Sequence, residues 1–240
     1  MNVYIWQEAV VGIFHNPSLW LISITDWTDL ITISDKNLWA SNVYNYWDTL
    51  SESNCGKFYQ RWNNYWFPFT WATTKSSSQV NAQNYWPWNY YNSSTFITVN
   101  YWDSSSNTNL RWGTTWTNEA MKWPCSSWYH IPKSSELKSL KDVWINIWAW
   151  TSTWVTNFSQ YLKAPLSWNL FSWNGTHVSN WTSWYFWSSE RASYAYAQYF
   201  ISSWISDWNS GYQSAIWLPI RPFANIPVEP DNTWTILYQP

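Results

Sequence analysis

Glycine is scarce in this chain of 240 residues, which contains 5 glycines and 28 tryptophans. A soluble protein of this length usually carries about 7% glycine, or roughly 17 residues. Glycine fills tight turns because it reaches positive φ without a steric cost. The turns of this chain must therefore be built largely from other residue types.

Tryptophan stands in the places where turn chemistry favours glycine. Asp26-Trp27 separates two strand-like runs, and an Asp-Gly pair would be a strong hairpin signal there. Trp47, Trp88 and Trp208 lie in similar polar turn clusters. Tryptophans chosen for burial would follow the period of a strand or a helix, and these follow turns. We infer that most of them are UGA glycine codons translated with a code that reads UGA as tryptophan; the alternative is a genuine Trp-rich protein.

This interpretation leads to two expectations. The gene should carry TGG codons at Trp187 and Trp234, which lie in strand-like contexts, and TGA codons at Trp20, Trp27, Trp39, Trp47, Trp66, Trp128, Trp144 and Trp184. In the folded chain, several of the turn tryptophans should project into solvent or adopt φ > 0. Their uniform burial in a packed core would favour the Trp-rich alternative.

Charged residues are also few. They make up 11% of the chain, with a formal net charge of -2, against about 25% in a usual soluble domain. No basic patch is available for a nucleic-acid backbone, and no apolar run approaches the roughly 20 residues of a membrane span. No signal peptide precedes the first strand-like run. We expect a fragment of a larger exported protein with a neutral, polar surface.

The central segment, residues 123–144, predicts a helix. Leu137, Leu140 and Val143 recur every three residues and can share one buried face. Ser134 and Ser135 can cap its first amides, and the helix is expected to stop at Val143, where the apolar period ends. A second short helix is expected over 157–163, capped by Asn157. Trp144 occupies the position where a C-terminal glycine is expected.

Strand patterns lie on both sides of these helices. The runs 21–25 and 30–34 predict a hairpin, and further strands are expected at 55–60, 95–99, 185–189, 194–201 and 213–223. Pro219 places the last of these at an edge or a bulge. Residues 70–117 are rich in Ser, Thr and Asn and predict a long irregular loop region. The order indicates an α+β fold with antiparallel strands.

Five phrases carry a family resemblance once Trp is read as Gly; they lie at 35–40, 59–67, 123–132, 186–189 and 220–223. Together they resemble the Fibrobacter succinogenes major paralogous domain family of bacterial surface and secreted modules. The resemblance implies a C-type-lectin-like α+β fold over 21–223, with two short helices, antiparallel strands and long irregular loops. Residues 1–20 would be a lead-in and 224–240 a linker or the start of a following module.

Two residues depart from the family pattern. Arg61 stands where the family usually has Trp, and Lys133 stands where a helix-capping Thr is common. The second departure weakens a capping box with Glu136.

The sequence offers no strong catalytic or metal site. The phrase ending in Tyr129-His130-Ile131-Pro132 is also similar to a segment of the formylglycine-generating enzyme family, whose chemistry needs cysteines in the C-terminal half. The two cysteines here, Cys55 and Cys125, both lie earlier. His15, His130 and His177 lack ligand partners at metal spacing, and Glu190 and Asp207 do not supply the six to eight oxygens of a calcium site. We expect no enzyme activity, catalytic residue, metal or cofactor, and a structural role for His130.

The cysteines and the C-terminal loops give the remaining expectations. Two cysteines, an uncharged polar surface and the resemblance imply a Cys55–Cys125 disulfide, worth about 4 kcal/mol for a loop of roughly 70 residues; the alternative is two buried free thiols. The composition of 192–212, rich in Tyr, Ser and Asn, is typical of binding loops.

We therefore expect a non-catalytic recognition or adhesion module, extracellular or at the cell surface. Its partner is expected to be a glycan, a peptide or a cell-surface protein, bound through Tyr194, Tyr196, Asp207, Asn209 and Tyr212. The alternative is a structural repeat module of a long surface protein.

Overall fold

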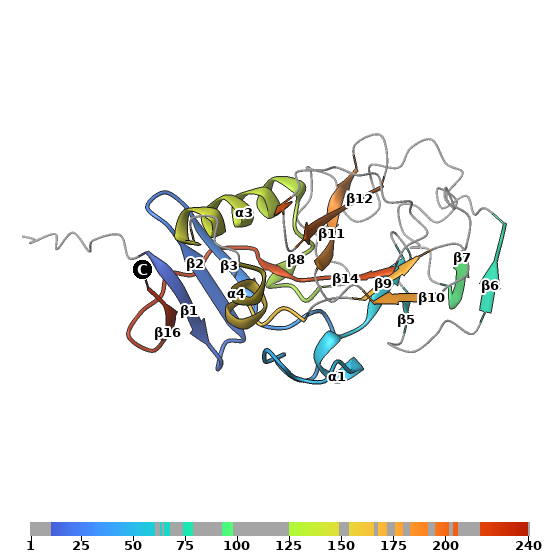
Figure 1. The fold of residues 1–240 in the computed structure, drawn as a ribbon, viewed down its shortest axis with the longest axis horizontal. Coiled ribbons are helices and arrows are strands. Elements are labelled where there is room, and N and C mark those ends of the chain that lie inside the picture. Colours follow the sequence, from blue (N-terminus) through green and yellow to red (C-terminus); the bar gives the residue numbers. More distant parts are fainter. Residues whose placement is uncertain are drawn as a thin grey trace, which may run out of the picture.

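The computed structural model describes residues 11–60, 63, 65–67, 74–78, 93–97, 125–148, 154–165, 168–171, 176–179, 183–191, 195–201, 204–205 and 217–239. These residues form a mixed α+β fold, in which a six-stranded antiparallel sheet is accompanied by a few short helices (Figure 1). Within the described ranges, no helix has the length and apolar character needed to cross a bilayer.

The six-stranded sheet has the order β16-β1-β2-β3-β15-β8. Its strands are β1 (Gly12–Asn16), β2 (Leu21–Thr25), β3 (Leu30–Ser34), β8 (Tyr129–His130), β15 (Phe223–Ala224) and β16 (Thr235–Tyr238). The hairpin predicted over 21–25 and 30–34 is confirmed with the same bounds. Asp26 holds its turn, because one carboxylate oxygen accepts the N–H groups of Thr28 and Asp29 at 2.8 Å.

The sheet extends beyond both expected domain boundaries. β1 lies within the expected lead-in and β16 within the expected linker, yet the two strands pair with each other, with Ile13 opposite Tyr238 and His15 opposite Thr235. β1 also pairs along its whole length with β2. Residues 12–16 and 235–238 are therefore part of the main sheet. Because the two strands are separated by more than 200 positions, no local pattern could reveal their pairing.

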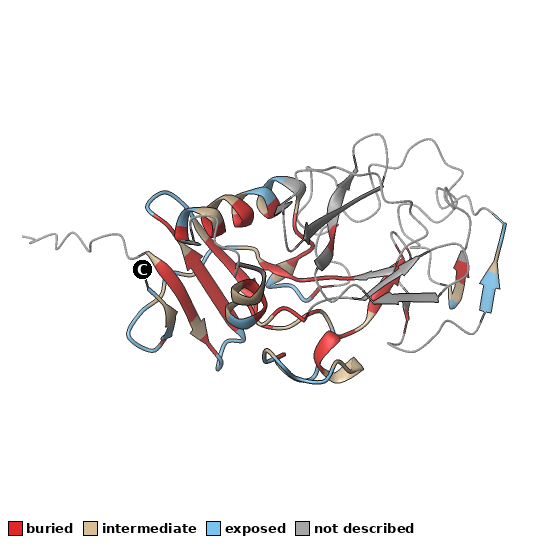
Figure 2. Cartoon of the chain, viewed as in Figure 1, coloured by how far each residue is buried: buried red, intermediate tan, exposed pale blue. Residues whose placement is uncertain are grey.

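One face of this sheet packs against α3 (Ser134–Trp148) and α4 (Trp154–Tyr161). The side chains at alternate strand positions form the core with the helices, as expected for a strand period of two. The main members are Ile13, Ile22, Ile24, Ile31, Ile33, Leu137, Leu140, Val143, Trp144, Phe158 and Leu162. Figure 2 shows the buried residues gathered on β1, β2 and β3.

The other face is covered by the segment 225–234. Phe14, Leu21 and Trp234 form a small buried cluster there, with Tyr129 and Val228 beside it. Polar bonds fix the segment, because the Ser23 hydroxyl donates to the Val228 carbonyl at 2.7 Å and the Val228 N–H donates to the Thr32 hydroxyl at 2.8 Å.

Both helices differ from their expected bounds. α3 does not end at Val143 but continues to Trp148, because Trp144 and Ile147 extend its buried stripe. The ring of Trp144 packs edge-on against Phe158 with centroids 5.2 Å apart. α4 begins at Trp154, three residues before the expected cap Asn157.

The N-terminus of α3 is also capped differently from expectation. Ser134 is already helical, so Lys133 is the N-cap, and its N–H donates to the Glu136 carboxylate at 2.7 Å. The Glu136 half of the capping box is therefore present. A Lys side chain cannot supply the other half, as the sequence indicated.

A second sheet has the order β10-β9-β14-β4-β5. Its strands are β4 (Phe58–Gln60), β5 (Trp66–Phe67), β9 (Trp168–Phe171), β10 (Thr176–Ser179) and β14 (Trp217–Pro219). The edge position expected for the strand with Pro219 is wrong, since β14 lies between β4 and β9. Pro219 is tolerated because it is the last strand residue and pairs only with Phe58, while β9 pairs at Trp217.

The remaining elements are smaller. They are α1 (Glu52–Cys55), the parallel pair β6 (Thr74–Ser76) and β7 (Thr95–Ile97), and the sheet of β11 (Ser183–Arg191), β12 (Ala195–Ile201) and β13 (Trp204–Ile205). The strands expected at 95–99, 185–189 and 194–201 thus exist with shifted bounds. The strand expected at 55–60 is shortened to β4 because α1 takes its first residue. The run expected at 213–223 is divided in the structure, where Ile220, Arg221 and Pro222 separate β14 from β15.

Candidate binding pocket

The five expected binding residues are largely outside the described part of the chain. Tyr196 lies on β12. Tyr194, Asp207, Asn209 and Tyr212 fall outside the described residues.

The expected disulfide is not formed: Cys55 and Cys125 are both free and buried. They lie in different surroundings, since Cys55 ends α1 close to Tyr44 while Cys125 lies close to Tyr59. Burial raises the pKa of the Cys55 thiol to about 12 and that of Cys125 further. Both thiols are therefore protonated at neutral pH and poor nucleophiles.

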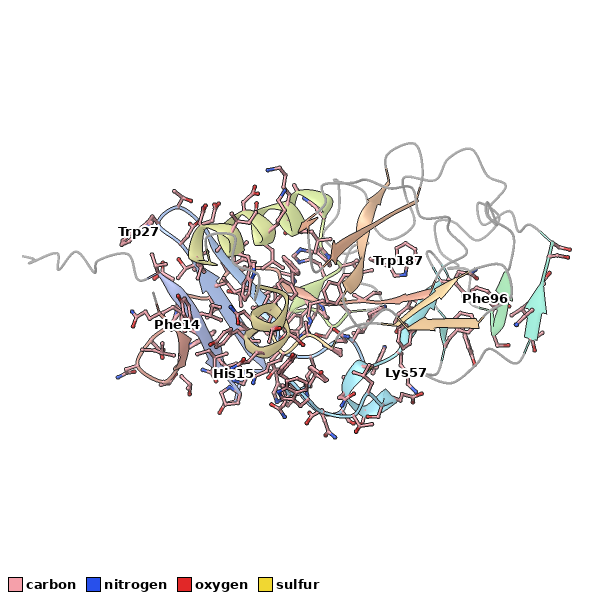
Figure 3. The ribbon with its side chains drawn as sticks, in the orientation of Figure 1. Phe14, His15, Trp27, Lys57, Phe96 and Trp187 are labelled. Atoms are coloured by element: carbon pink, nitrogen blue, oxygen red, sulfur yellow. The ribbon has the colours of Figure 1, made fainter. Side chains whose placement is uncertain are left out.

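The turn tryptophans behave as expected. Trp20, Trp27, Trp39, Trp47 and Trp128 all project into solvent. Three of them have positive φ, with values of 58° at Trp20, 64° at Trp39 and 82° at Trp47. Figure 3 shows Trp27 pointing away from the end of the β2–β3 hairpin.

Trp39 and Trp47 each occupy the third position of a four-residue turn, where a type II turn favours glycine. The Ala40 N–H donates to the Asn37 carbonyl at 3.0 Å, which makes Trp39 the third residue of a four-residue turn. The Asp48 N–H donates to the Asn45 carbonyl at 2.9 Å, which places Trp47 in the same way. Positive φ at the third residue is the mark of a type II turn.

The tryptophans expected to be genuine lie in the interior. Trp234 belongs to the cluster on the outer sheet face. Trp187 is fully buried on β11 (Figure 3), and its indole N–H donates to the Tyr59 carbonyl at 2.7 Å. Among the expected glycine positions, Trp144 is buried within α3, while Trp66 lies on β5 and Trp184 on β11 rather than in turns.

A pocket of about 690 Å³ opens where three segments meet: the β1–β2 turn, the residues leading into β8, and the residues after β15. We call it the Tyr129 pocket. Its lining is mainly apolar with hydroxyl and amide groups among it, and consists of Ser18, Leu19, Trp20, Leu21, Ser126, Ser127, Trp128, Tyr129, Ala224, Asn225, Ile226 and Val228. None of these described lining residues carries a charge.

Large apolar side chains are exposed at this pocket. Leu19, Trp20 and Trp128 are all more than half exposed, and Ile226 is 76% exposed. Exposed apolar side chains that gather in one place mark interaction sites more often than single ones do. A smaller pocket of about 460 Å³ adjoins it, shares Trp20, Ser126 and Tyr129, and adds Lys36.

Hydrogen bonds hold the walls of the Tyr129 pocket. Asn16 fixes the β1–β2 turn, because its side-chain oxygen accepts the N–H groups of Ser18 and Leu19 at 3.1 and 3.2 Å. The Asn225 N–H donates to the Trp128 carbonyl at 3.0 Å. The pocket is thus built on backbone that is already fixed, as binding sites usually are.

Tyr129 is the titratable residue of the lining. Burial, followed by the negative charge of Asp35, raises the pKa of its phenol above the ordinary value. The phenol is therefore protonated at neutral pH and can donate or accept a hydrogen bond.

His130 lies beneath the pocket wall as a satisfied structural residue, which confirms the expectation. It is buried, its Nδ1 lies 3.0 Å from Oδ1 of Asn225, and its Nε2 lies 2.9 Å from both carboxylate oxygens of Glu136.

A second set of buried polar side chains consists of Asp35 and Arg221, which come from segments far apart in the sequence. Asp35 is fully buried and accepts a 3.0 Å bond from His15 Nε2, when that nitrogen carries the proton. Arg221 is also buried and donates to the carbonyls of Ser34 and Lys163 at 2.9 and 2.8 Å. Burial lowers the pKa of Arg221 to about 10, although the charge of Asp35 opposes this shift. These bonds position the segment 34–40 beside the pockets.

Sequence reasoning missed this group and the pocket for the same reason. Asp35 and Arg221 lie far apart in the chain, and the three pocket segments are separated by about 100 residues each. The available signal was indirect, since both charged residues lie in phrases that carry the family resemblance.

Comparison with known proteins supplies no template for the pocket. The chain matches no model of a known protein family, and searches of curated proteins and of solved structures give no match. Among the described residues, no group of three or more His, Cys, Asp and Glu side chains is arranged to hold a metal ion. The role of the pocket must be inferred from its own side chains.

Proposed function

We propose that this chain is a non-catalytic recognition or adhesion module of an exported or surface protein, and that the Tyr129 pocket contributes to binding. The observation that carries the proposal is the gathering of exposed apolar side chains around an uncharged, pre-formed pocket. Such pockets combine apolar contact area with a few fixed polar groups that orient a ligand.

The chemistry of the lining supports binding more than catalysis. A general base or nucleophile needs a titratable side chain near its operating pH, and the Tyr129 phenol has its pKa raised instead. The formylglycine-generating type of oxidase chemistry is also disfavoured, because both thiols are buried and protonated.

The partner is proposed to be uncharged where it enters the pocket. A glycan, a peptide segment or a loop of another surface protein can meet this condition, since each can offer apolar faces together with hydroxyl or amide groups. The C-terminal residues Tyr194, Tyr196, Asp207, Asn209 and Tyr212 are kept as a second candidate surface because of their composition. A structural module in a long surface chain remains the alternative function.

We also propose that the exposed tryptophans at turns occupy positions that are glycine in the natural product, within the lectin-like family suggested by the five phrases. The turn geometry of Trp39 and Trp47 supports this. With glycine at Trp20 and Trp128, the pocket would widen but keep Leu19, Tyr129 and Ile226. Sequencing the gene tests the idea: TGA codons are expected at the exposed turn tryptophans, and TGG at all of them would contradict it.

The binding proposal is tested by a glycan and cell-surface screen with this chain and with its glycine-restored form. The sharpest variant is Ile226→Ser, because Ile226 is exposed and its loss should not unfold the protein. Burying an isoleucine contributes about 1.5–3 kcal/mol, so the variant should bind at least about tenfold more weakly.

Ile236→Ser is the matched control, since this isoleucine is 55% exposed on β16 and outside the pocket. Equal binding by wild type and Ile226→Ser would remove the pocket from the proposal. A variant with Ala at Tyr194, Tyr196, Asp207, Asn209 and Tyr212 tests the second candidate surface. If no form of the protein binds any partner in the screen, the structural-module alternative is favoured.

A further inference from the structure

The smaller pocket beside the Tyr129 pocket differs from it in carrying a charge. We call this pocket of about 460 Å³ the Lys36 pocket, because Lys36 is the one charged residue of its described lining. The ammonium nitrogen of Lys36 lies 4.6 Å from the centroid of the Trp20 ring. Since Trp20 and Tyr129 line both pockets, the positive charge lies where the two pockets meet.

Lys36 is a partly buried cation that has no acidic partner within the described ranges. Its contact is the Trp20 ring, whereas Lys57, Lys138 and Lys141 each form an ion pair with a carboxylate. Taking a cation partly out of water costs free energy unless an anion or a hydrogen-bond acceptor compensates for the lost hydration. A negatively charged group of a ligand in this pocket would provide that compensation.

Hydroxyl groups in the same lining can assist the ammonium. Ser126 and Tyr129 each contribute one. The Tyr129 phenol keeps its proton at neutral pH, because burial and the negative charge of Asp35 raise its pKa. An ammonium and hydroxyls all donate hydrogen bonds, and such bonds are stronger to an ionised acceptor than to a neutral one. This set of donors suits a carboxylate.

Asp35 is the nearby anion that would repel a ligand carboxylate. It is fully buried and interacts with the buried guanidinium of Arg221, which opposes its charge. Arg221 also reaches the wall of the Lys36 pocket, where it donates to the Ser34 carbonyl at 2.9 Å. Because Arg221 offsets Asp35, Lys36 leaves the pocket with one positive charge in excess.

The wall that carries Lys36 is held by hydrogen bonds of its backbone. The Asp35 N–H donates to the Trp20 carbonyl at 2.9 Å. The Ser34 N–H donates to the Pro222 carbonyl at 2.9 Å, and the Lys36 N–H donates to the Ser34 hydroxyl at 3.2 Å. The backbone that positions the ammonium is thus already ordered, which lowers the entropic cost of binding a ligand.

The hydroxyl groups of the Tyr129 pocket favour a sugar over a peptide as the neutral part of the ligand. Ser18, Ser126, Ser127 and Tyr129 each bring one to its lining. A protein hydroxyl both donates and accepts, as the hydroxyls of a sugar ring do, so the two sets can pair in several orientations. A peptide N–H or C=O group is restricted to one of these roles. The exposed apolar side chains of the pocket can pack against the C–H groups of the ring.

We propose that the Lys36 pocket is the subsite for the carboxylate of an acidic sugar, whose neutral part occupies the Tyr129 pocket. The proposal rests on the proposed function of the Tyr129 pocket and adds the chemical class of its ligand. The Lys36 ammonium forms an ion pair with the carboxylate, and the hydroxyls of Ser126 and Tyr129 donate to it.

The proposal is tested with methyl glucuronide and methyl glucoside, two sugars that differ in a carboxylate and a hydroxymethyl group. Their dissociation constants are measured by NMR titration of the full chain at low ionic strength. The glucuronide should bind about tenfold more tightly, the lower limit for a hydrogen bond to a charged group. This preference should shrink in about 1 M salt, where the Debye length falls to roughly 3 Å.

Variants locate the source of the preference. Lys36→Gln should weaken glucuronide binding to the level of the glucoside, and Lys36→Arg, which keeps the charge, should restore most of the difference. Lys138→Gln is the matched control, because it changes the net charge equally at an exposed position of α3 outside both lining sets. It should keep the preference. A preference that survives in Lys36→Gln would overturn the assignment of the subsite.

Failure of this proposal can be told apart from failure of the proposed function. Equal binding of the two sugars by wild type would overturn the carboxylate subsite and leave the Tyr129 pocket as a binding site. If neither sugar binds, the acidic-sugar proposal is wrong, and the screen with Ile226→Ser decides the function of the pocket on its own. Tighter binding of the peptide acetyl-Gly-Glu-Gly-amide than of the glucuronide would replace the sugar by an acidic peptide and overturn the assignment of the ligand class.

Discussion

Replacing Trp47 with glycine should stabilise this protein, although it deletes the largest of all side chains. Trp47 is 84% exposed and has a φ of 82° at the third position of the Asn45–Asp48 turn. A left-handed backbone conformation costs a residue with a Cβ about 1–2 kcal/mol. Glycine adopts it freely but loses about 0.4–1 kcal/mol through the greater entropy of the unfolded chain. The net gain is at most about 0.5–1 kcal/mol, because the substitution also removes the contact between the Trp47 and Tyr46 rings, whose centroids lie 4.3 Å apart.

Trp27→Gly is the matched control for this experiment. Trp27 is 75% exposed and also lies in a turn, but it is not among the residues with positive φ. Glycine at this position relieves no strain and carries only the entropic cost, so it should destabilise by about 0.4–1 kcal/mol. The two variants should therefore differ by about 1–2 kcal/mol in opposite directions, which cancels any general effect of removing an exposed indole.

Urea unfolding measures the difference. With a slope of about 1–3 kcal/mol per molar urea, the midpoints of the two variants should be separated by at least about 0.3 M. Trp20→Gly should likewise gain less than the strain relief alone, because Lys36 lies 4.6 Å above the Trp20 ring and an exposed cation–π contact contributes about 0.5–1 kcal/mol. Equal destabilisation by Trp47→Gly and Trp27→Gly would refute the strain argument and favour a genuine Trp-rich protein.

Three further changes have expected outcomes. The pKa of Glu136 is lowered from its ordinary value of 4.5, so its ionised form contributes stability that is present above about pH 4.5 and is lost as the pH falls through the lowered value. The unfolding midpoint of Glu136→Gln should therefore depend less on pH in this range than that of the wild type. An unchanged dependence would contradict this. The thiols of Cys55 and Cys125 should be unreactive toward a thiol reagent in the native protein and react after unfolding, whereas no reaction after non-reducing unfolding would reveal a disulfide. Trp144→Gly should destabilise by at least about 3–5 kcal/mol, as for removal of a buried aromatic ring, and a neutral effect would show that the ring is not packed in the core.

Local patterns predicted the elements that depend on neighbours in sequence. The β2–β3 hairpin follows from two alternating runs and the turn-forming Asp26, all within 14 residues. The start of α3 was also close, because Ser134, Ser135 and the apolar spacing mark it. Its end was wrong because Trp144 was interpreted as a substitute for a terminal glycine, while the side chain continues the buried stripe of the helix.

Pairings between distant segments could not be predicted in this way. β1 and β16 are five and four residues long, and nothing in either segment specifies the other. The Tyr129 pocket has the same origin, since each of its three segments contains ordinary turn residues and only the sheet brings them together. The candidate site from composition, by contrast, lies mostly outside the described residues and stays a prediction.

The tryptophans divide into two groups by environment. This division limits how many of them can be glycine codons translated as tryptophan. At Trp39 and Trp47 the backbone has the geometry that suits glycine and the indole is mostly exposed. Gly56, a true glycine, has a φ of 76°, and a Cβ there would lie 2.4 Å from the Leu38 carbonyl oxygen, so the chain retains glycine at a position where no other residue fits. At Trp144 the side chain fills the space between α3 and α4, where a glycine would leave a cavity beside Phe158. A single codon rule that assigns glycine to both groups therefore requires the glycine-restored protein to pack this helix pair differently.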